Sequence, residues 1–206
     1  MKYKELCNML SEYNINVIEQ VVTLDFDEAL EFASSRYPVA VKGISEKMTH
    51  KTEVGLVKLG IKNEEELKSA WNEIYGKMEG AEPEGIAVQR MARKGIELIV
   101  GGREDVQFGP VVMFGLGGIF VEIFRDFSLR VCPISERDAD EMIKEIRGYP
   151  LLLGTRGTEG ANIQEIKKLL LNFSDMLVEK RVNEIDLNPV IAYRDGYVVV
   201  DARVKE

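Results

Sequence analysis

The middle of the chain is a succession of short apolar runs, and this feature limits the possible folds more than any other. Between residues 86 and 132 the sequence contains IAVQRM, IELIVGG, PVVMFG, IFVEIF and FSLRVC, each of strand length and rich in β-branched or aromatic residues. Two further strand patterns precede this region, at residues 39–42 and 57–61. The fold is therefore expected to contain many consecutive strands.

Helical patterns lie on both sides of these strands. Helices are expected at residues 3–13, 25–36, 63 to about 78, 136–147 and 163–180. Most of them begin with a residue that caps helix N-termini, namely Asp25, Asn63, Ser135 and Asn162. Because helices and strands intermix, the sequence predicts an α+β fold with a mainly antiparallel sheet, arranged as two lobes.

Composition and charge narrow the class of partner. The net charge is -8, whereas a nucleic-acid partner requires a basic surface, so no nucleic acid is expected. No apolar run approaches the ~20 residues that span a bilayer, and the N-terminus lacks the apolar core of a secretion signal. A cytoplasmic protein without membrane contact is therefore expected. With one histidine and two distant cysteines, a zinc site is not expected.

The end of the chain predicts a β-hairpin whose polar side chains share one face. Glu184, Asp186 and Asn188 alternate along VNEIDLNPVIAY and so point to the same side of a strand. With Asp195-Gly196 as the two-residue turn, Asn188 is expected to lie opposite Arg203 in the second strand, YVVVDARV.

Asp201 is expected on the same face, one diagonal step from Asn188. Pro189 would change this register if it inserted a bulge. A carboxylate and an amide oxygen that converge there suit Mg²⁺, which commonly takes one or two protein oxygens and leaves its other positions to water and phosphates. A solvated polar face on an edge hairpin is the alternative, and the spacing leaves both open.

Two further features are compatible with phosphate binding. Lys42 interrupts an apolar strand, where an unpaired lysine is costly, so either a phosphate group or a structural salt bridge is expected beside it. The glycines of FGLGG, residues 114–118, would let backbone N–H groups approach an anion. No helix follows them, so this is neither a Rossmann nor a Walker motif, and a glycine-rich hairpin turn explains it equally well.

His50, the single histidine, stands in the polar segment SEKMTHKTE, residues 45–53. No apolar periodicity predicts its burial. A neutral imidazole with a reference pKa of about 6.5 is a competent nucleophile at neutral pH, and Lys51 would help to neutralise an incoming phosphoryl group. A surface histidine without a chemical role is the alternative.

These segments together resemble the ATP-grasp β subunit of NDP-forming acyl-CoA synthetases, the ADP-forming acetate–CoA ligases. The resemblance is carried by YPVAVKGIS, THKTEVG, VQRMARKGIELIVGGREDVQFGPVVMFGLGGIFVE, LLGTRG, EIDLNPV and VVVDAR. It covers nearly the whole chain, and the long central segment and the HK[ST] segment are specific to this family. EIDLNPV and DAR are also similar to the β subunit of succinate–CoA ligase.

The resemblance implies a single ATP-grasp domain over residues 1–206, with ATP or ADP held between two lobes. The expected lobes are residues 1–20 with 88–206, and residues 21–87. The residues expected at the nucleotide are Lys42 at its phosphates and Gln89, Arg90 and Met91 at its adenine side, largely through backbone groups, with Glu97 nearby.

The resemblance also implies a phosphoryl-transfer role. Asn188 and Asp201 would hold Mg²⁺, and His50 would be the second phosphohistidine of the family. It would take the phosphoryl group from a histidine on a partner α subunit, which binds coenzyme A, and deliver it to ADP. The expected reaction is acyl-CoA + ADP + phosphate ⇌ carboxylic acid + CoA + ATP, catalysed by a hetero-oligomer, with the acyl selectivity in the α subunit.

Three positions depart from the usual family pattern. The loop usually reads HKSDxGG, whereas here Glu53 replaces the aspartate and Leu56 replaces the second glycine. After LLGTRG the family usually has an aspartate, and this chain has Asn162, which is also a good helix cap. None of these changes removes a residue expected to take part in phosphoryl transfer.

Two other functions are compatible with the same residues. The chain could be a catalytically silent, ATP-binding regulatory module, although the presence of His50, Lys42, Asn188 and Asp201 counts against that role. It could also be another ATP-grasp ligase, such as a succinate–CoA ligase β-like subunit, that uses an acyl-phosphate directly and needs no histidine. Substitution of His50 separates these functions.

Overall fold

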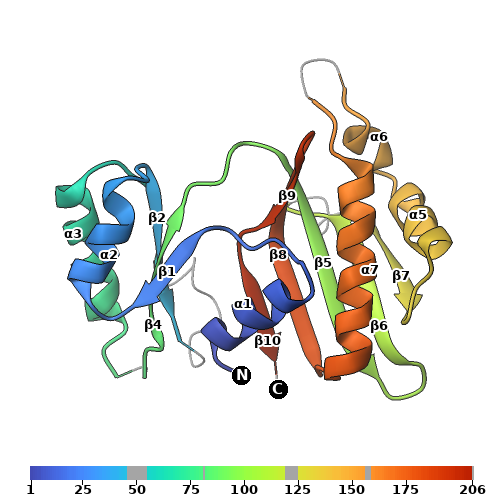
Figure 1. The fold of residues 1–206 in the computed structure, drawn as a ribbon, viewed down its shortest axis with the longest axis horizontal. Coiled ribbons are helices and arrows are strands. Elements are labelled where there is room, and N and C mark those ends of the chain that lie inside the picture. The colour runs from blue at the N-terminus through green and yellow to red at the C-terminus, as the bar shows by residue number, and fades with distance from the viewer. Residues whose placement is uncertain (46–54, 81, 119–124, 156–158, 206) are drawn as a thin grey trace. The chain divides into compact units, whose positions relative to one another are not determined.

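The structure is a computed structural model that describes residues 1–45, 55–80, 82–118, 125–155 and 159–205. The chain forms two compact units (Figure 1). Unit 1 comprises Met1, Glu5–Val17 and Lys94–Glu206, and unit 2 comprises Lys2–Lys4 and Ile18–Arg93. Each unit has its own sheet and its own hydrophobic core.

Unit 1 contains the larger sheet. Its strands are β5 (Ile96–Asp105), β6 (Gly109–Leu116), β7 (Phe127–Val131), β8 (Glu184–Tyr193), β9 (Gly196–Val199) and β10 (Ala202–Lys205). They are ordered β10-β8-β5-β6-β7, with β9 also pairing β8, and every pairing is antiparallel. The strand expected from IFVEIF falls at residues 119–124, which lie outside the described residues.

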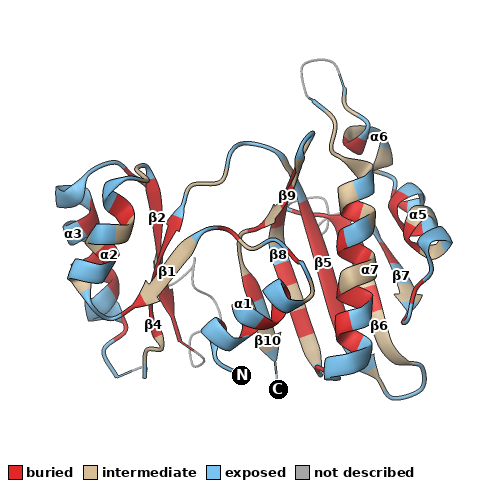
Figure 2. Ribbon diagram, viewed as in Figure 1, coloured by how far each residue is buried: buried red, intermediate tan, exposed pale blue. Residues whose placement is uncertain are grey.

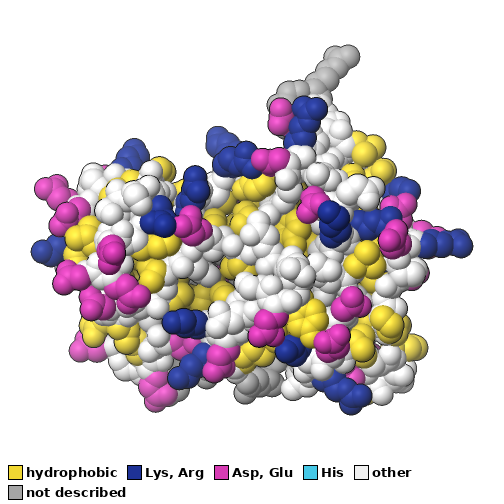
Figure 3. Space-filling view, in the orientation of Figure 1, with side chains coloured by type: hydrophobic (Ala, Val, Ile, Leu, Met, Phe, Trp, Pro, Cys, Tyr) yellow, Lys and Arg dark blue, Asp and Glu magenta, His cyan; other side chains and the backbone are white. Residues whose placement is uncertain are grey.

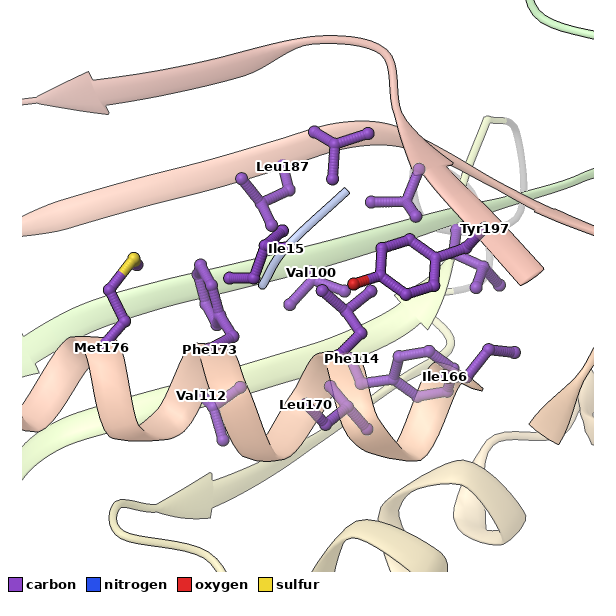
Figure 4. Close-up of a cluster of buried hydrophobic side chains, with 14 of the residues drawn as sticks. Ile15, Val100, Val112, Phe114, Ile166, Leu170, Phe173, Met176, Leu187 and Tyr197 are labelled. Atoms are coloured by element: carbon purple, nitrogen blue, oxygen red, sulfur yellow. The ribbon is translucent and has the colours of Figure 1, made fainter. Parts of the chain in front are cut away.

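One face of this sheet is buried beneath helices. The helices of this part of the chain are α1 (Tyr3–Glu12), α5 (Glu136–Glu145), α6 (Tyr149–Leu152) and α7 (Ile163–Lys180). Side chains of α7, among them Leu170 and Phe173, point toward Val100 and Phe114 on the sheet (Figure 4). Each fully buried side chain of this size contributes about 1.5–3 kcal/mol to stability. The buried face of the larger sheet therefore holds unit 1 together.

Unit 2 is a smaller antiparallel sheet with helices on one face. Its elements are β1 (Gln20–Thr23), α2 (Phe26–Ser34), β2 (Val39–Ile44), β3 (Val57–Ile61), α3 (Glu64–Lys77) and β4 (Gly85–Arg90), with the strands ordered β1-β4-β2-β3. Val41 and Val88 pack against the helices, where Phe26 meets Trp71 edge-on at 5.7 Å between ring centroids. Alternation along β2 and β4 then directs a second set of side chains to the other face: Ala40, Lys42, Ala87 and Gln89.

The expected helix caps are confirmed by hydrogen bonds. Ser135 and Asp138 form a reciprocal capping box at the start of α5. The Asp25 carboxylate accepts from the N–H groups of Asp27 and Glu28, and the Asn63 side chain accepts from the N–H of Glu66 at 2.9 Å. The side chain of Asn162 caps α7 in the same way. The short elements β1 and α6 have no counterpart in the sequence expectations, because a few residues carry too little periodicity.

The C-terminal hairpin has a different register from the one expected. Tyr193 pairs with Gly196, so the two-residue turn is Arg194-Asp195 rather than Asp195-Gly196. Arg203 consequently lies opposite Asp186, not Asn188. Gly196, at φ +149, takes a conformation that glycine adopts easily, and this allows it to close the turn. The second strand is also divided into β9 and β10.

The new register is shifted by two positions, and a shift of two keeps every side chain on its face. The pairs Val190↔Val199 and Leu187↔Ala202 belong to one continuous register, so Pro189 inserts no bulge into the hairpin. The irregularity at Asn188–Pro189 lies instead on the side of β5, where the register shifts between Leu98↔Val190 and Val100↔Leu187. Asp201 therefore lies directly opposite Asn188 instead of one diagonal step away. The expected sharing of one face is retained.

The surface carries charges of both signs. Acidic and basic side chains are interspersed over the face shown in Figure 3. Strands β2 and β4 are buried along almost their whole length (Figure 2). Pairs such as Lys144–Asp140 on α5, at 2.7 Å, are exposed and contribute little to stability. No helix within the described ranges is long and apolar enough to cross a membrane.

Candidate functional site

The candidate metal ligands lie opposite each other in unit 1. The N–H of Asn188 donates to the carbonyl oxygen of Asp201 at 3.0 Å. Their neighbours Leu187 and Ala202 belong to the core that α7 covers, so alternation directs the side chains of Asn188 and Asp201 to the other side of the sheet. The Asp201 side chain is only 13% exposed, its Oδ2 lies 3.6 Å from Nε of Arg203, and its Oδ1 is buried. We call this side of the larger sheet its polar face, defined by Asp186, Asn188, Asp201 and Arg203.

A carboxylate and an amide side chain on facing strand positions fit a Mg²⁺ ion that takes one or two protein oxygens. Among the residues that the structure describes, no group of three or more acidic, histidine or cysteine side chains is arranged to hold a metal ion by itself. An ion at Asn188 and Asp201 would therefore complete its coordination with water or phosphate oxygens. This is the coordination expected of an ion that arrives with a nucleotide.

Asp186 lies on the same face, in a hollow. Cross-strand pairs place Arg203, Asp186, Gly101, Met113 and Leu129 in one row across the sheet. Because Gly101 has no side chain, a pocket of about 400 Å³ opens beside Asp186, and burial raises the pKa of that carboxyl group. Alternation along β8 places Asp186 on this face from sequence alone, but its burial depends on the strands beside it.

Glu97 is exposed near the start of β5, where it pairs with Ile191 of β8. Its carbonyl oxygen accepts the N–H of Gly117 at 2.7 Å. Gly115 is part of strand β6, and Gly117 continues beside β5. The described part of the glycine-rich segment, up to Gly118, therefore runs along Glu97.

Lys42 occupies the middle of β2 in unit 2. It pairs with Ala87 on one side and Val57 on the other, and it is only 6% exposed. Its side chain leaves the sheet on the face away from α2 and α3. A lysine held at this depth needs an anionic or polar partner, because burial of an isolated ammonium group is costly. The strand thus fixes the position of this positive charge.

The expected adenine-side residues form the end of β4. The Gln89 side chain is 1% exposed, and its Nε2 donates to Oε1 of Gln20 at 2.7 Å. The N–H groups of Arg90 and Met91 donate to the carbonyl oxygens of Glu19 and Pro38, at 3.0 and 3.4 Å. A pocket of about 470 Å³ opens here. Its lining consists of Glu19, Ser35, Arg36, Tyr37, Pro38, Arg90 and Met91.

His50 lies outside the described residues, as do Lys51 and Glu53. Leu56, the departure from the family pattern that follows them, is fully buried in the core of unit 2. Its carbonyl oxygen accepts the N–H of Gly43 at 2.9 Å. The chain is thus anchored at Leu56. The other candidate residues divide between the units, with Lys42 and Gln89–Met91 in unit 2 and Glu97, Asn188 and Asp201 in unit 1.

Known proteins are similar to this chain over nearly its whole length. The family model of the ATP-grasp domain matches residues 1–205. The β subunit of ADP-forming acetate–CoA ligase II from Pyrococcus furiosus is 44% identical, over 97% of this chain and 89% of that subunit.

Two solved structures from Ca. Korarchaeum cryptofilum are also similar. One is acetyl-coenzyme A synthetase 1 in complex with coenzyme A, Ca-AMPCP and HgCl⁺, with a TM-score of 0.94 and 45% identity over 99% of this chain and 92% of that one. The other is the same synthetase with coenzyme A and Mg-AMPPCP, its phosphohistidine segment pointing towards the nucleotide-binding site. It has a TM-score of 0.85 and 43% identity, over 99% of this chain and 91% of that one. The chain therefore belongs to the ATP-grasp family and, within it, to the β subunits of ADP-forming acetate–CoA ligases.

Proposed function

We propose that this chain is the nucleotide-binding and phosphoryl-carrying half of an ADP-forming acyl-CoA synthetase. The complete enzyme would interconvert acyl-CoA, ADP and phosphate with carboxylic acid, CoA and ATP. A separate α subunit would bind coenzyme A and the acyl group, and would choose the acid. A cytoplasmic location accompanies this proposal, since ATP and coenzyme A are both cytoplasmic substrates.

The observation that carries the proposal is the facing pair Asn188 and Asp201. Their side chains share the polar face of the larger sheet, and the Asp201 carboxylate is largely buried beside Arg203. Asn188 and Asp201 would hold Mg²⁺, which neutralises phosphate charge when it is bound. The similar Korarchaeum synthetase has been solved with Mg-AMPPCP, which supports a Mg-nucleotide as the ligand here.

The remaining candidate residues would bind the nucleotide: Lys42, Gln89, Arg90, Met91 and Glu97. Lys42 would place a fixed positive charge at its phosphates. The N–H groups of Arg90 and Met91 already donate within unit 2, so hydrogen bonds to the base would come from carbonyl acceptors. Adenine offers an amino group to such an acceptor, whereas guanine presents an oxygen at the same position. ADP is therefore expected to bind more tightly than GDP.

His50 would carry the phosphoryl group between the subunits. A neutral imidazole nitrogen would attack the phosphorus of a phosphohistidine on the α subunit; its N–P bond to the α-subunit histidine would break, and that histidine would leave. The β-phosphate oxygen of ADP would then displace His50 from the phosphorus and form ATP. The Korarchaeum synthetase, which is 43% identical to this chain, has a phosphohistidine segment, and this supports a carrier role for His50.

Reconstitution tests the proposed division of labour. The purified chain alone should form no ATP from acyl-CoA, ADP and phosphate, whereas the chain with its α subunit should form it. His50→Ala should abolish this activity, and a matched substitution of the same segment, Thr49→Ala, should retain most of it. ATP formation by the chain alone would contradict the need for a partner. Full activity of His50→Ala in the complex would contradict the carrier role.

A further inference from the structure

The sequence left two interpretations of the glycine-rich segment 114–118, a phosphate-binding segment or a hairpin turn. Its contacts with Glu97 point to a third role. Gly117 continues the β5–β6 ladder beyond the pair Leu98↔Leu116, and its N–H donates to the carbonyl oxygen of Glu97 at 2.7 Å. This donor is therefore already used by the protein. The segment also places Gly118 beside a carboxylate, and a negative charge there disfavours phosphate. Gly117 and Gly118 thus make a poor phosphate cradle.

Both glycines leave space that Glu97 fills. A Cβ atom on Gly117 would lie 3.2 Å from the backbone carbon and from Cβ of Glu97. A Cβ atom on Gly118 would lie 3.3 Å from Oε2 of Glu97. These distances from the added Cβ atoms are shorter than ordinary van der Waals contacts. Because Gly117 and Gly118 have no side chains, both the backbone and the carboxylate of Glu97 can lie against them.

We propose that Gly117 and Gly118 position the Glu97 carboxylate for nucleotide binding, an inference that rests on the proposed contact between Glu97 and the nucleotide. Glu97 is exposed, and a free glutamate side chain samples many rotamers. Contact with Gly118 restricts it before the nucleotide arrives. A group that is held in its bound conformation gives a tighter complex, because less conformational entropy is lost on binding.

The test is Gly118→Ala, compared with Gly109→Ala at the other end of β6. Both glycines have positive φ, +61 and +74, so both substitutions introduce the same kind of backbone strain. Only Gly118 has Glu97 within reach, since a Cβ on Gly109 would meet nothing within 4 Å. Calorimetric titration of the full chain with Mg-ATP should show binding weakened by about fivefold or more in Gly118→Ala, and within about twofold of the parent in Gly109→Ala. Equal losses in the two variants would overturn the proposal.

A double-mutant cycle separates positioning from a general effect on folding. Glu97→Ala should weaken Mg-ATP binding, and adding Gly118→Ala to it should cause no further loss, because the group that Gly118 positions has been removed. Additive losses would overturn the positioning role while leaving the nucleotide contact of Glu97 intact. A third result is possible, in which Glu97→Ala binds Mg-ATP as tightly as the parent while Gly118→Ala binds it more weakly. This would contradict the proposed contact of Glu97 with the nucleotide, and with it the role of Glu97 as the positioned group.

Discussion

The two faces of the larger sheet are made from the same strands but differ in what they hold. On the face under α7, Val100, Phe114 and Leu187 are fully buried and pack in one core. On the polar face, Asp186, Asn188 and Asp201 stand at the alternate positions of β8 and beside β10. Strand alternation thus separates residues that stabilise the fold from residues that are candidates for chemistry. Substitutions on the two faces should have separable effects.

The largest effect is expected on the buried face. Phe173 of α7 is fully buried, so Phe173→Ala should lower the free energy of unfolding by about 3–5 kcal/mol through lost burial and a new cavity. Val178→Ala on the same helix, where the side chain is 37% exposed, should cost less than about 1 kcal/mol. Denaturant unfolding monitored by circular dichroism measures both. Similar losses in the two variants would contradict the assignment of the core.

A smaller effect, confined to binding, is expected on the polar face. Asp201→Asn should weaken Mg-nucleotide binding by about tenfold to a hundredfold, since it removes the charge expected to hold the metal. Its unfolding free energy should change by less than about 1 kcal/mol, because the partner Arg203 keeps access to water. Asp195→Asn in the turn of the same hairpin is the matched control and should bind normally. A large loss of stability without a loss of binding would make Asp201 a structural residue.

The smallest effect is a pH dependence at Asp186. Burial raises the pKa of this carboxyl group, so the folded protein keeps its proton to higher pH than the unfolded chain does. The resulting stabilisation is complete below the unfolded pKa of about 3.9 and is lost as pH rises through the folded pKa. The amide side chain of Asp186→Asn has no titratable proton and stays neutral at every pH. It should therefore gain stability relative to the parent as pH rises above about 4.

Asp138 provides a comparison of opposite sign. Its hydrogen bonds with Ser135 lower its pKa, so its contribution to stability is present above the unfolded pKa and is lost as pH falls through the folded pKa. Asp138→Asn should lose stability relative to the parent as pH rises. Unfolding curves measured across the acidic range give both trends. If the stabilities of the two variants relative to the parent changed in the same direction as pH rises, burial would not be what distinguishes Asp186 from Asp138.

The sequence predicted the features that depend on local chemistry. Ser135 and Asn162 cap helices because their side chains bond to N–H groups a few residues ahead, and such contacts are visible in the sequence. The shared face of Asn188 and Asp201 was also predictable, since it requires only alternation. It survived the error in register because a shift of two positions preserves the face.

The features that the sequence could not predict depend on contacts between distant segments. The turn is ambiguous because Arg194-Asp195 and Asp195-Gly196 can each close a hairpin, and only the paired strands show which one does. The hollow at Asp186 requires Gly101 to lie in the same row on the neighbouring strand. The contact of Gly118 with Glu97 joins β5 to a residue just after β6, and the register of these two strands was unknown.

The most direct test of the phosphoryl-carrier role is transfer of label from γ-labelled ATP to the chain. The purified chain would be incubated with Mg²⁺ and labelled ATP in the presence of its α subunit, in parallel with His50→Ala. The expected result is label on the parent β chain that is lost in acid and stable in alkali, with none on the β chain of the variant. Equal labelling of the parent and the His50→Ala β chains would contradict the role of His50 as a phosphoryl carrier. So would the absence of label on the parent β chain when the α subunit is present.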